Sequence, residues 1–167
     1  MKHCRSTPLV LCVVGSQNAG KTTLVEKLIA EYKRQGFRVG TVKHHHIGDF
    51  EIDYPGKDSW RHSQAGADVV FLSSFFKAAM IKKVEQELLL EQIVDLMGEV
   101  DIVLAEGYKE SNRPKILVCS GDPARQADPA PEVICTVGHC DNFKDIPAFE
   151  PDDVQGLVNF LQPFLKE

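Results

Sequence analysis

One short segment constrains this chain more than any other: residues 15–22 read Gly-Ser-Gln-Asn-Ala-Gly-Lys-Thr. This is the pattern G-x-x-x-x-G-K-[S/T], which cradles nucleotide phosphates where it joins a buried strand to a helix. Residues 9–14 before it are continuously apolar, as expected for a strand buried on both faces of a parallel sheet. After it, apolar residues recur at helical spacing from Leu24 to Tyr32, and Gly36 is placed to end the helix. The segment therefore predicts a strand, a phosphate loop, a helix and a bound nucleotide.

Each residue type in the phosphate loop, residues 15–22, has an expected task. Gly15 and Gly20 permit backbone angles that turn successive N–H groups toward phosphate oxygens. Lys21 is expected to reach the terminal phosphates and act in catalysis, while the hydroxyl of Thr22 suits Mg²⁺, which prefers oxygen ligands. The predicted nucleotide contacts on this segment are Gly15, Ser16, Gln17, Asn18, Ala19, Gly20, Lys21, Thr22 and Thr23.

Composition narrows the class of protein. A chain of 167 residues with 43% hydrophobic content favours one compact nucleotide-binding domain over residues 1–167. The net charge of -5 argues against a general nucleic-acid-binding role, because no basic field would attract a polyanion. No apolar run reaches the length of a membrane span, and the first strand begins too early to leave room for a cleaved signal sequence. We expect a cytoplasmic protein that binds neither nucleic acid nor membrane.

The five cysteines agree with a reducing compartment. Their number is odd and no C-x-x-C pair occurs. Cys12, Cys119 and Cys135 lie in apolar, strand-like runs, where a thiol behaves as a small hydrophobe. Cys140 lies in a loop beside His139, a weak signal for chemistry. We expect reduced, structural thiols throughout.

Strand and helix patterns alternate along the chain, which predicts a doubly wound α/β sheet. The runs 68–72 and 75–84 are separated only by Ser73-Ser74, so they fit either a β-hairpin or two separate strands of the sheet. Further strands are expected over residues 37–43, 101–106, 115–119 and 133–137, and further helices over residues 58–65, 88–97 and 154–165.

Two acidic residues follow predicted strands at the edge where open α/β sheets bind ligands. Glu106 ends the strand that starts at Asp101, so it is expected to hold Mg²⁺ or to orient an attacking water; the alternative is a helix cap or a surface carboxylate. Asp141 follows the strand 133–137 at the position where guanine-specific proteins use an aspartate to bind the base. A turn-forming aspartate fits the same pattern, so the guanine prediction stays open.

Residues 44–46 are three consecutive histidines, which suggests Zn²⁺ or Ni²⁺. A complete metal site would need further ligands from elsewhere in the chain. We favour a loop that responds to phosphate and Mg²⁺, with Asp49 or Asp53 as its acidic member. Asp53 therefore joins Thr22 and Glu106 as a candidate magnesium ligand.

Several segments together resemble one family. They are the phosphate loop, the run K-H-H-H-I-G-D-F-E-I-D-Y-P-G-K-D-S-W-R-H from Lys43 to His62, the following Ala65-Gly66-Ala67, and A-E-G-Y-K from Ala105 to Lys109 with Pro114-Lys115. In these segments the chain resembles the molybdopterin-guanine dinucleotide biosynthesis protein B (MobB) family over almost its whole length. The resemblance implies a P-loop NTPase fold, a mostly parallel sheet flanked by helices, with a β-hairpin extension.

The resemblance also implies a function. It implies a homodimeric adapter that binds GTP and Mg²⁺, hydrolyses GTP weakly, and assists the guanylyltransferase MobA in forming molybdopterin guanine dinucleotide. Molybdopterin or its guanine dinucleotide is the implied second ligand, and the stretch from Phe71 to Ile81 is the candidate hairpin for the dimer. Two alternatives remain: an enzyme whose GTP turnover drives assembly, and a metal-delivering P-loop GTPase suggested by the histidines. The loop has no arginine beside it, which favours the adapter.

Overall fold

The computed structural model describes residues 7–45, 48–120, 130–140, 142–143 and 145–165. The chain divides into two compact units, residues 1–44 with 90–167 and residues 45–89. The expectation of one nucleotide-binding domain over residues 1–167 stays a prediction. Within the described ranges, no helix has the length and apolar character needed to cross a membrane.

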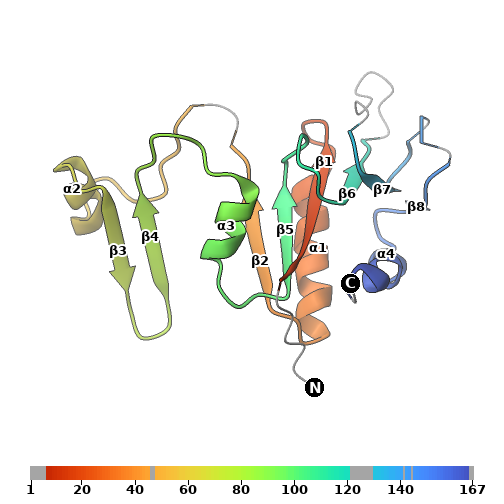
Figure 1. Ribbon diagram of the computed structural model, residues 1–167, viewed down its shortest axis with the longest axis horizontal. Helices are drawn as coiled ribbons and strands as arrows, with labels where there is room; N and C mark the ends of the chain where they lie inside the picture. Colours follow the sequence, from red (N-terminus) through yellow and green to blue (C-terminus); the bar gives the residue numbers. More distant parts are fainter. Residues whose placement is uncertain (1–6, 46–47, 121–129, 141, 144, 166–167) are drawn as a thin grey trace. The chain divides into compact units, whose positions relative to one another are not determined.

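The first unit is built on a six-stranded parallel sheet with the strand order β2-β5-β1-β6-β7-β8 (Figure 1). Strands β1, β5 and β6 are buried almost throughout, which explains why their sequences are continuously apolar. The predicted doubly wound α/β fold is confirmed. Its strands are β1 (Leu9–Gly15), β2 (Val39–Lys43), β5 (Ile102–Glu106), β6 (Lys115–Val118), β7 (Val133–Val137) and β8 (Ala148–Phe149).

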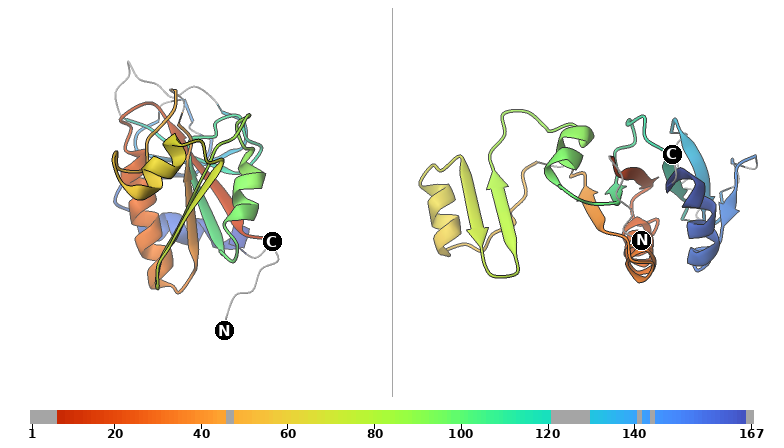
Figure 2. Two further views of the ribbon diagram at one scale, coloured as in Figure 1. Left: turned by 90° about the vertical axis from the view of Figure 1, so that its left-hand side faces the viewer. Right: turned by 60° about the horizontal axis from the view of Figure 1, so that its bottom comes forward.

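Helices cover both faces of this sheet (Figure 2). Helices α1 (Lys21–Arg34) and α4 (Val154–Leu161) pack on one face, and a 3-10 turn at Gln162–Leu165 follows α4. Helix α3 (Leu90–Leu96) packs on the other. Alternate residues of β1 serve the two cores, since successive strand side chains point to opposite faces: Leu11 and Val13 lie in the α1 core, Val10 and Cys12 in the α3 core.

The second unit contains helix α2 (Asp58–Gln64) and an antiparallel pair of strands, β3 (Val69–Ser73) and β4 (Ala78–Lys82). Phe71 lies opposite Met80, and the turn is closed by the N–H of Ser74, which donates to the carbonyl of Lys77 at 2.8 Å. Of the two readings that the sequence left open, the β-hairpin is the one observed.

Helices α2 and α4 begin at residues 58 and 154, as expected, whereas one strand was not expected. The N-cap of α4 is Asp153, whose carboxylate accepts from the N–H of Gly156 at 2.9 Å, and the neighbouring Asp152 pairs with Lys27. Helix α2 begins after Lys57 and has no side-chain cap. Strand β8 was not predicted, because two residues are too few to show a periodicity.

Candidate functional site

The phosphate loop joins β1 to α1 at the carboxyl edge of the first unit's sheet. Gly15 and Gly20 both have positive φ, 150° and 97°, and a side chain on Gly15 would collide with the backbone carbonyl of Val118 in β6. Gly20 is the N-cap of α1, where backbone N–H groups and the helix dipole favour an anion. The loop thus has the backbone form of a phosphate cradle. The residues predicted to contact the nucleotide, Gly15 to Thr23, all lie in this loop and in the first turn of α1.

Lys21 folds back over its own loop. Its ammonium group donates to the carbonyls of Ser16 at 2.7 Å and Gly15 at 3.1 Å. Partial burial lowers the pKa of Lys21, an effect that Glu106 opposes through its negative charge and Lys43 reinforces through its positive one. The cation therefore lies beside the loop, and its contact with the terminal phosphates stays a prediction.

Glu106 lies beside the phosphate loop because β5 is the neighbour of β1. The hydroxyl of Thr22 donates to both carboxylate oxygens of Glu106, at 3.0 and 3.1 Å, although 84 residues separate them. A hydroxyl and a carboxylate are oxygen donors of the kind Mg²⁺ prefers, so this pair fits that ion. The structure therefore brings together two of the three predicted magnesium ligands, and their metal role stays a prediction.

Lys43 is a member of this cluster that sequence reasoning missed. Its ammonium group lies 3.3 Å from the Glu106 carboxylate, and the two residues are register partners on β2 and β5. Lys43 ends the predicted strand 37–43, so the sequence could have placed it at the ligand-binding edge of the sheet. The sequence did not show that β2 lies next to β5, and therefore did not show that Lys43 lies opposite Glu106. The cluster of Lys21, Thr22, Lys43 and Glu106 joins two cations, a hydroxyl and a carboxylate at one edge, and we call it the phosphate-edge cluster.

The described part of the histidine run, His44 and His45, makes one backbone hydrogen bond and two ring contacts. The backbone N–H of His44 donates to the carbonyl of Glu106 at 2.9 Å, and its ring stacks on Tyr108 with centroids 4.9 Å apart. His45 contacts Phe50 edge to face, and His46 lies outside the described residues. Across the described ranges, no three His, Cys, Asp or Glu side chains gather as a metal would require.

Asp53 belongs to the second unit. One carboxylate oxygen of Asp53 accepts from the N–H of Tyr54 at 2.8 Å, which is an Asx-type contact within its own loop. Asp49 does the same with Phe50 at 2.9 Å. A magnesium role for Asp53 stays a prediction.

A pocket of about 340 Å³ lies at the carboxyl ends of β7 and β8, within the size range of small-ligand sites. Thr136 lines it, is 1% exposed, and its hydroxyl has no hydrogen-bond partner among the described residues. Such a buried group is costly unless something completes its bonding. Asp141, the predicted base-reading residue, lies outside the described residues, one position after the pocket residue Cys140. The pocket is lined by Thr136, Gly138, His139, Cys140, Phe143, Ile146, Ala148, Phe149, Glu150 and Asp153.

The pocket and the phosphate loop lie on the same edge of the sheet. Gly15 is the register partner of Val118, Val118 of Val137, and Val137 of Phe149. Three inter-strand spacings separate the loop from the last of these, or about 14 Å. A nucleotide with its phosphates in the loop can extend along this edge toward the pocket.

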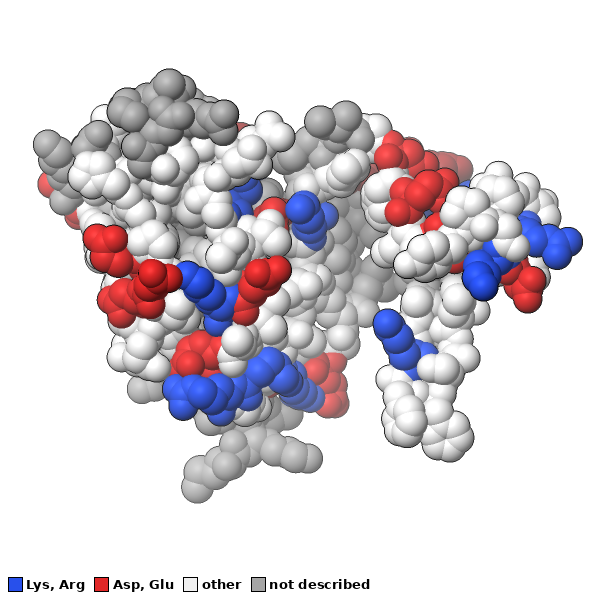
Figure 3. Space-filling view, turned by 180° about the vertical axis from the view of Figure 1, so that it is seen from behind, with Lys and Arg blue, Asp and Glu red and all other residues white. Residues whose placement is uncertain are grey.

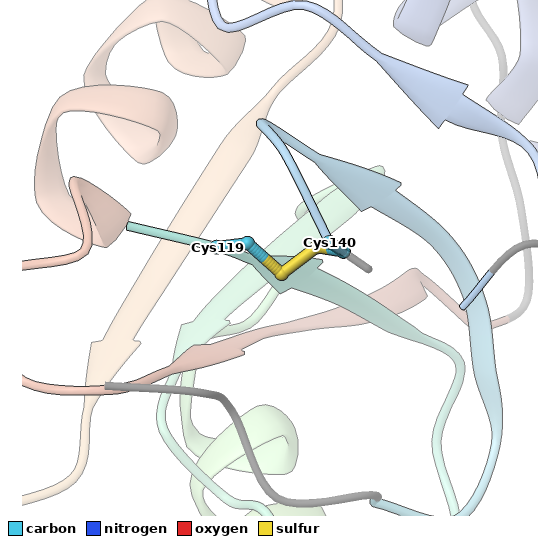
Figure 4. The surroundings of a disulfide bond; sticks show 2 residues. All are labelled: Cys119 and Cys140. Carbon is cyan, nitrogen blue, oxygen red and sulfur yellow. A yellow bond between two sulfur atoms is a disulfide. The ribbon is translucent and has the colours of Figure 1, made fainter. Parts of the chain in front are cut away.

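The expectation of reduced thiols was wrong for two cysteines. Cys119, after β6, and Cys140, after β7, form a disulfide with 5.6 Å between their Cα atoms (Figure 4). Sequence spacing did not reveal it, because 21 residues separate the pair and only the β6–β7 pairing brings them together. Cys12 and Cys135 are free and buried, as expected, and Cys4 lies outside the described residues.

A family model, curated relatives and solved structures all relate this chain to the same protein family. Residues 10–138 match the family described as "Molybdopterin guanine dinucleotide synthesis protein B". The chain is 31% identical to the "Probable molybdopterin-guanine dinucleotide biosynthesis adapter protein" of Bacillus subtilis, over 99% of this chain and 98% of the relative. It is 28% identical to the adapter protein of Escherichia coli, over 95% and 94%. The crystal structure of Bacillus subtilis MobB superposes with a TM-score of 0.76 at 28% identity, covering 94% of this chain and 97% of that one.

Proposed function

The chain belongs to the MobB family, and from that premise we propose that it is a nucleotide-binding adapter in the biosynthesis of molybdopterin guanine dinucleotide. The observation that carries the proposal is the contact of the Thr22 hydroxyl with Glu106 beside the phosphate loop, at 3.0 Å. It puts a pair of oxygen donors next to a phosphate cradle, as binding of a magnesium nucleotide requires. The family match favours this reading over a metal-delivering protein.

We propose GTP as the nucleotide and Mg²⁺ as its ion. Lys21 would bind the terminal phosphates, and Thr22 with Glu106 would hold the ion, which neutralises phosphate charge when bound. The pocket at β7 and β8 would receive the base, with Thr136 completing its hydrogen bonding there and Asp141 selecting guanine. The roughly 14 Å between loop and pocket supports one ligand reaching both.

We assign it a binding role with slow hydrolysis rather than fast turnover. An arginine at the transferring phosphate is worth about 10³ to 10⁵ in rate, and residues 15–23 contain none. Arg113 pairs with Glu91 at 3.2 Å. In this role the protein would work in the cytoplasm and present the nucleotide, or molybdopterin, to the guanylyltransferase MobA.

A binding and turnover experiment tests this function. GTP and ATP affinities are measured by calorimetry with Mg²⁺, and phosphate release is followed with and without the transferase partner. We expect GTP to bind more tightly than ATP and the isolated protein to turn over slowly. Fast turnover by the isolated protein would contradict the adapter role, and absence of GTP binding would contradict the proposal as a whole.

We also propose a homodimer formed through the β3–β4 hairpin. Its large apolar side chains are exposed, with Phe75 and Phe76 at 97% and Phe71 at 63%. On the face seen in Figure 3, the tip of the hairpin is uncharged and a Lys or Arg side chain lies just above it. Exposed apolar surface of this kind marks an interaction site. Replacing both Phe75 and Phe76 by serine should convert a dimer to a monomer in light scattering; an unchanged mass would place the interface elsewhere.

A further inference from the structure

We propose that Cys119 and Cys140 are a reversible redox pair, and that their disulfide holds the nucleotide-base pocket in its binding form. The inference rests on the proposed function for the identity of the ligand. Its own basis is geometric, because the pair joins the ends of two neighbouring strands at the wall of the pocket (Figure 4).

The backbone around the disulfide is closely packed. The N–H of Cys119 donates to the carbonyl of Val137 at 2.9 Å, and the N–H of Gly138 donates to the carbonyl of Phe149 at 2.9 Å. Gly138 has φ +85°, and a Cβ there would come within 2.6 Å of the Cys119 carbonyl. The chain after β7 therefore passes directly over the end of β6, where the two sulfur atoms meet.

The four described cysteines differ in their surroundings. Cys12 and Cys135 are fully buried, and burial raises the pKa of both thiols, that of Cys135 to about 12. Such thiols stay protonated and unreactive, because the thiolate is the reacting species. Cys119 and Cys140 are only half-buried. The bonded pair is thus the pair with partial solvent exposure, which reaction with a low-molecular-weight disulfide or thiol requires.

The chemistry is a thiol–disulfide exchange with a small disulfide such as glutathione disulfide. The thiolate of one cysteine attacks a sulfur of the oxidant, forming a mixed disulfide and releasing one glutathione thiolate. The second cysteine's thiolate then attacks the protein sulfur of that mixed disulfide and releases the second glutathione. The protein loses two electrons and two protons, and the oxidant becomes two thiols. Disulfides of intracellular proteins are mostly of this transient, sensing kind.

The effect on the pocket follows from its lining. Gly138, His139 and Cys140 form consecutive parts of the wall, and the opposite parts come from β8 and the start of α4. With the disulfide closed, this wall is tied to β6 through Cys119. Reduction breaks this covalent link, so the pocket wall of the unliganded protein can adopt more conformations. Ligand binding must then select one of them, at a cost in conformational entropy. Preorganised sites bind more tightly for this reason, and we expect the oxidised protein to hold the base better.

The test compares oxidised and reduced full-length protein, prepared with glutathione disulfide and dithiothreitol, with the redox state verified by mass spectrometry. Two probes are titrated with Mg²⁺: GTP, which extends into the pocket, and inorganic triphosphate, which fills only the phosphate loop. Reduction should weaken GTP binding by about fivefold or more, the lower range of typical coupling between sites. Triphosphate binding should be the same in both states.

Three cysteine variants test whether the redox response depends on this disulfide. Cys140→Ser and Cys119→Ser should each bind GTP like the reduced protein in both buffers, whereas Cys135→Ser, a buried control, should keep the redox response. Equal GTP affinity in both verified states would overturn the inference while leaving the proposed function intact. An equal change for GTP and triphosphate would also overturn it, because the effect would lie at the phosphate loop. Absence of GTP binding in both the oxidised and the reduced state would refute the proposed function and this inference together.

Discussion

Replacing Glu106 by glutamine should have opposite effects on nucleotide binding with and without magnesium. The substitution keeps the shape and removes one negative charge from the phosphate-edge cluster. Glu106 has a side chain 13% exposed, and it accepts from the Thr22 hydroxyl and pairs with Lys43 at 3.3 Å. When Mg²⁺ is present, the substitution weakens binding of the ion because one carboxylate ligand is missing. When Mg²⁺ is absent, the substitution strengthens nucleotide binding, because no carboxylate repels the phosphates and Lys43 is free to move toward them.

The magnitudes follow from the geometry. Thr22 would stand between Glu106, 3.0 Å away, and a bound phosphate, so in the absence of Mg²⁺ the carboxylate and phosphate charges would lie about 6 Å apart. Two unit charges at that distance repel by about 0.7 kcal/mol in water, which is a threefold change in affinity or slightly more. Loss of a group that orients a metal ligand typically costs about 10- to 100-fold in metal affinity. The pair with Lys43, whose side chain is 65% exposed, should contribute less than about 1 kcal/mol to stability.

The assay is fluorescence or calorimetric titration of GTP, first in EDTA and then at increasing Mg²⁺. Glu106→Gln should bind GTP about threefold more tightly than wild type in EDTA. The variant should also need about 10- to 100-fold more Mg²⁺ than wild type before Mg²⁺ changes its affinity for GTP. Glu99→Gln is the matched control, since it removes the same charge from a carboxylate that is 90% exposed and paired with Arg38. A variant with the magnesium requirement of wild type would refute the reasoning, because Glu106 would then play no part at the ion.

Three further outcomes are expected. Lys21→Ala should lower GTP affinity by about a hundredfold or more through lost phosphate contacts and leave urea denaturation nearly unchanged; unaltered binding would show that Lys21 is not at the phosphates. Tyr32 is fully buried and its hydroxyl has no partner among the described residues, so Tyr32→Phe should raise the free energy of unfolding by about 1 kcal/mol, and a loss in urea denaturation would contradict this. Burial raises the pKa of Cys135 to about 12 from 9.0, so the unfolded thiol ionises first. The free energy of unfolding should therefore fall above pH 9, by up to about 1.4 kcal/mol per unit, and less steeply in Cys135→Ala; equal slopes would place the titration elsewhere.

Local sequence was sufficient for most of the helices and strands and for the phosphate loop. The loop at residues 15–22 was predictable because its glycines, lysine and threonine act within one strand–loop–helix unit whose parts are adjacent in the chain. Apolar runs and helical periodicity likewise located β1, β5, β7 and α1, since burial on both faces or on one face imprints a period on the sequence. The choice between a hairpin and two sheet strands at residues 68–84 stayed open, because both satisfy the same short apolar pattern.

The tertiary structure decided which residues meet. Glu106 contacts Thr22 and Lys43 because β5 lies between β1 and β2 in the sheet, an order that the succession of strands along the chain does not express. The disulfide of Cys119 and Cys140, and the pocket that Thr136 lines, depend in the same way on β6, β7 and β8 being neighbours. Periodicity reports how each segment is buried, whereas the pairing of parallel strands is set by the long crossovers between them. The chain by itself thus specified the strand, loop and helix of a phosphate-loop unit and pointed to Glu106, and the fold supplied the contacts of Glu106 with Thr22 and Lys43, the disulfide and the pocket.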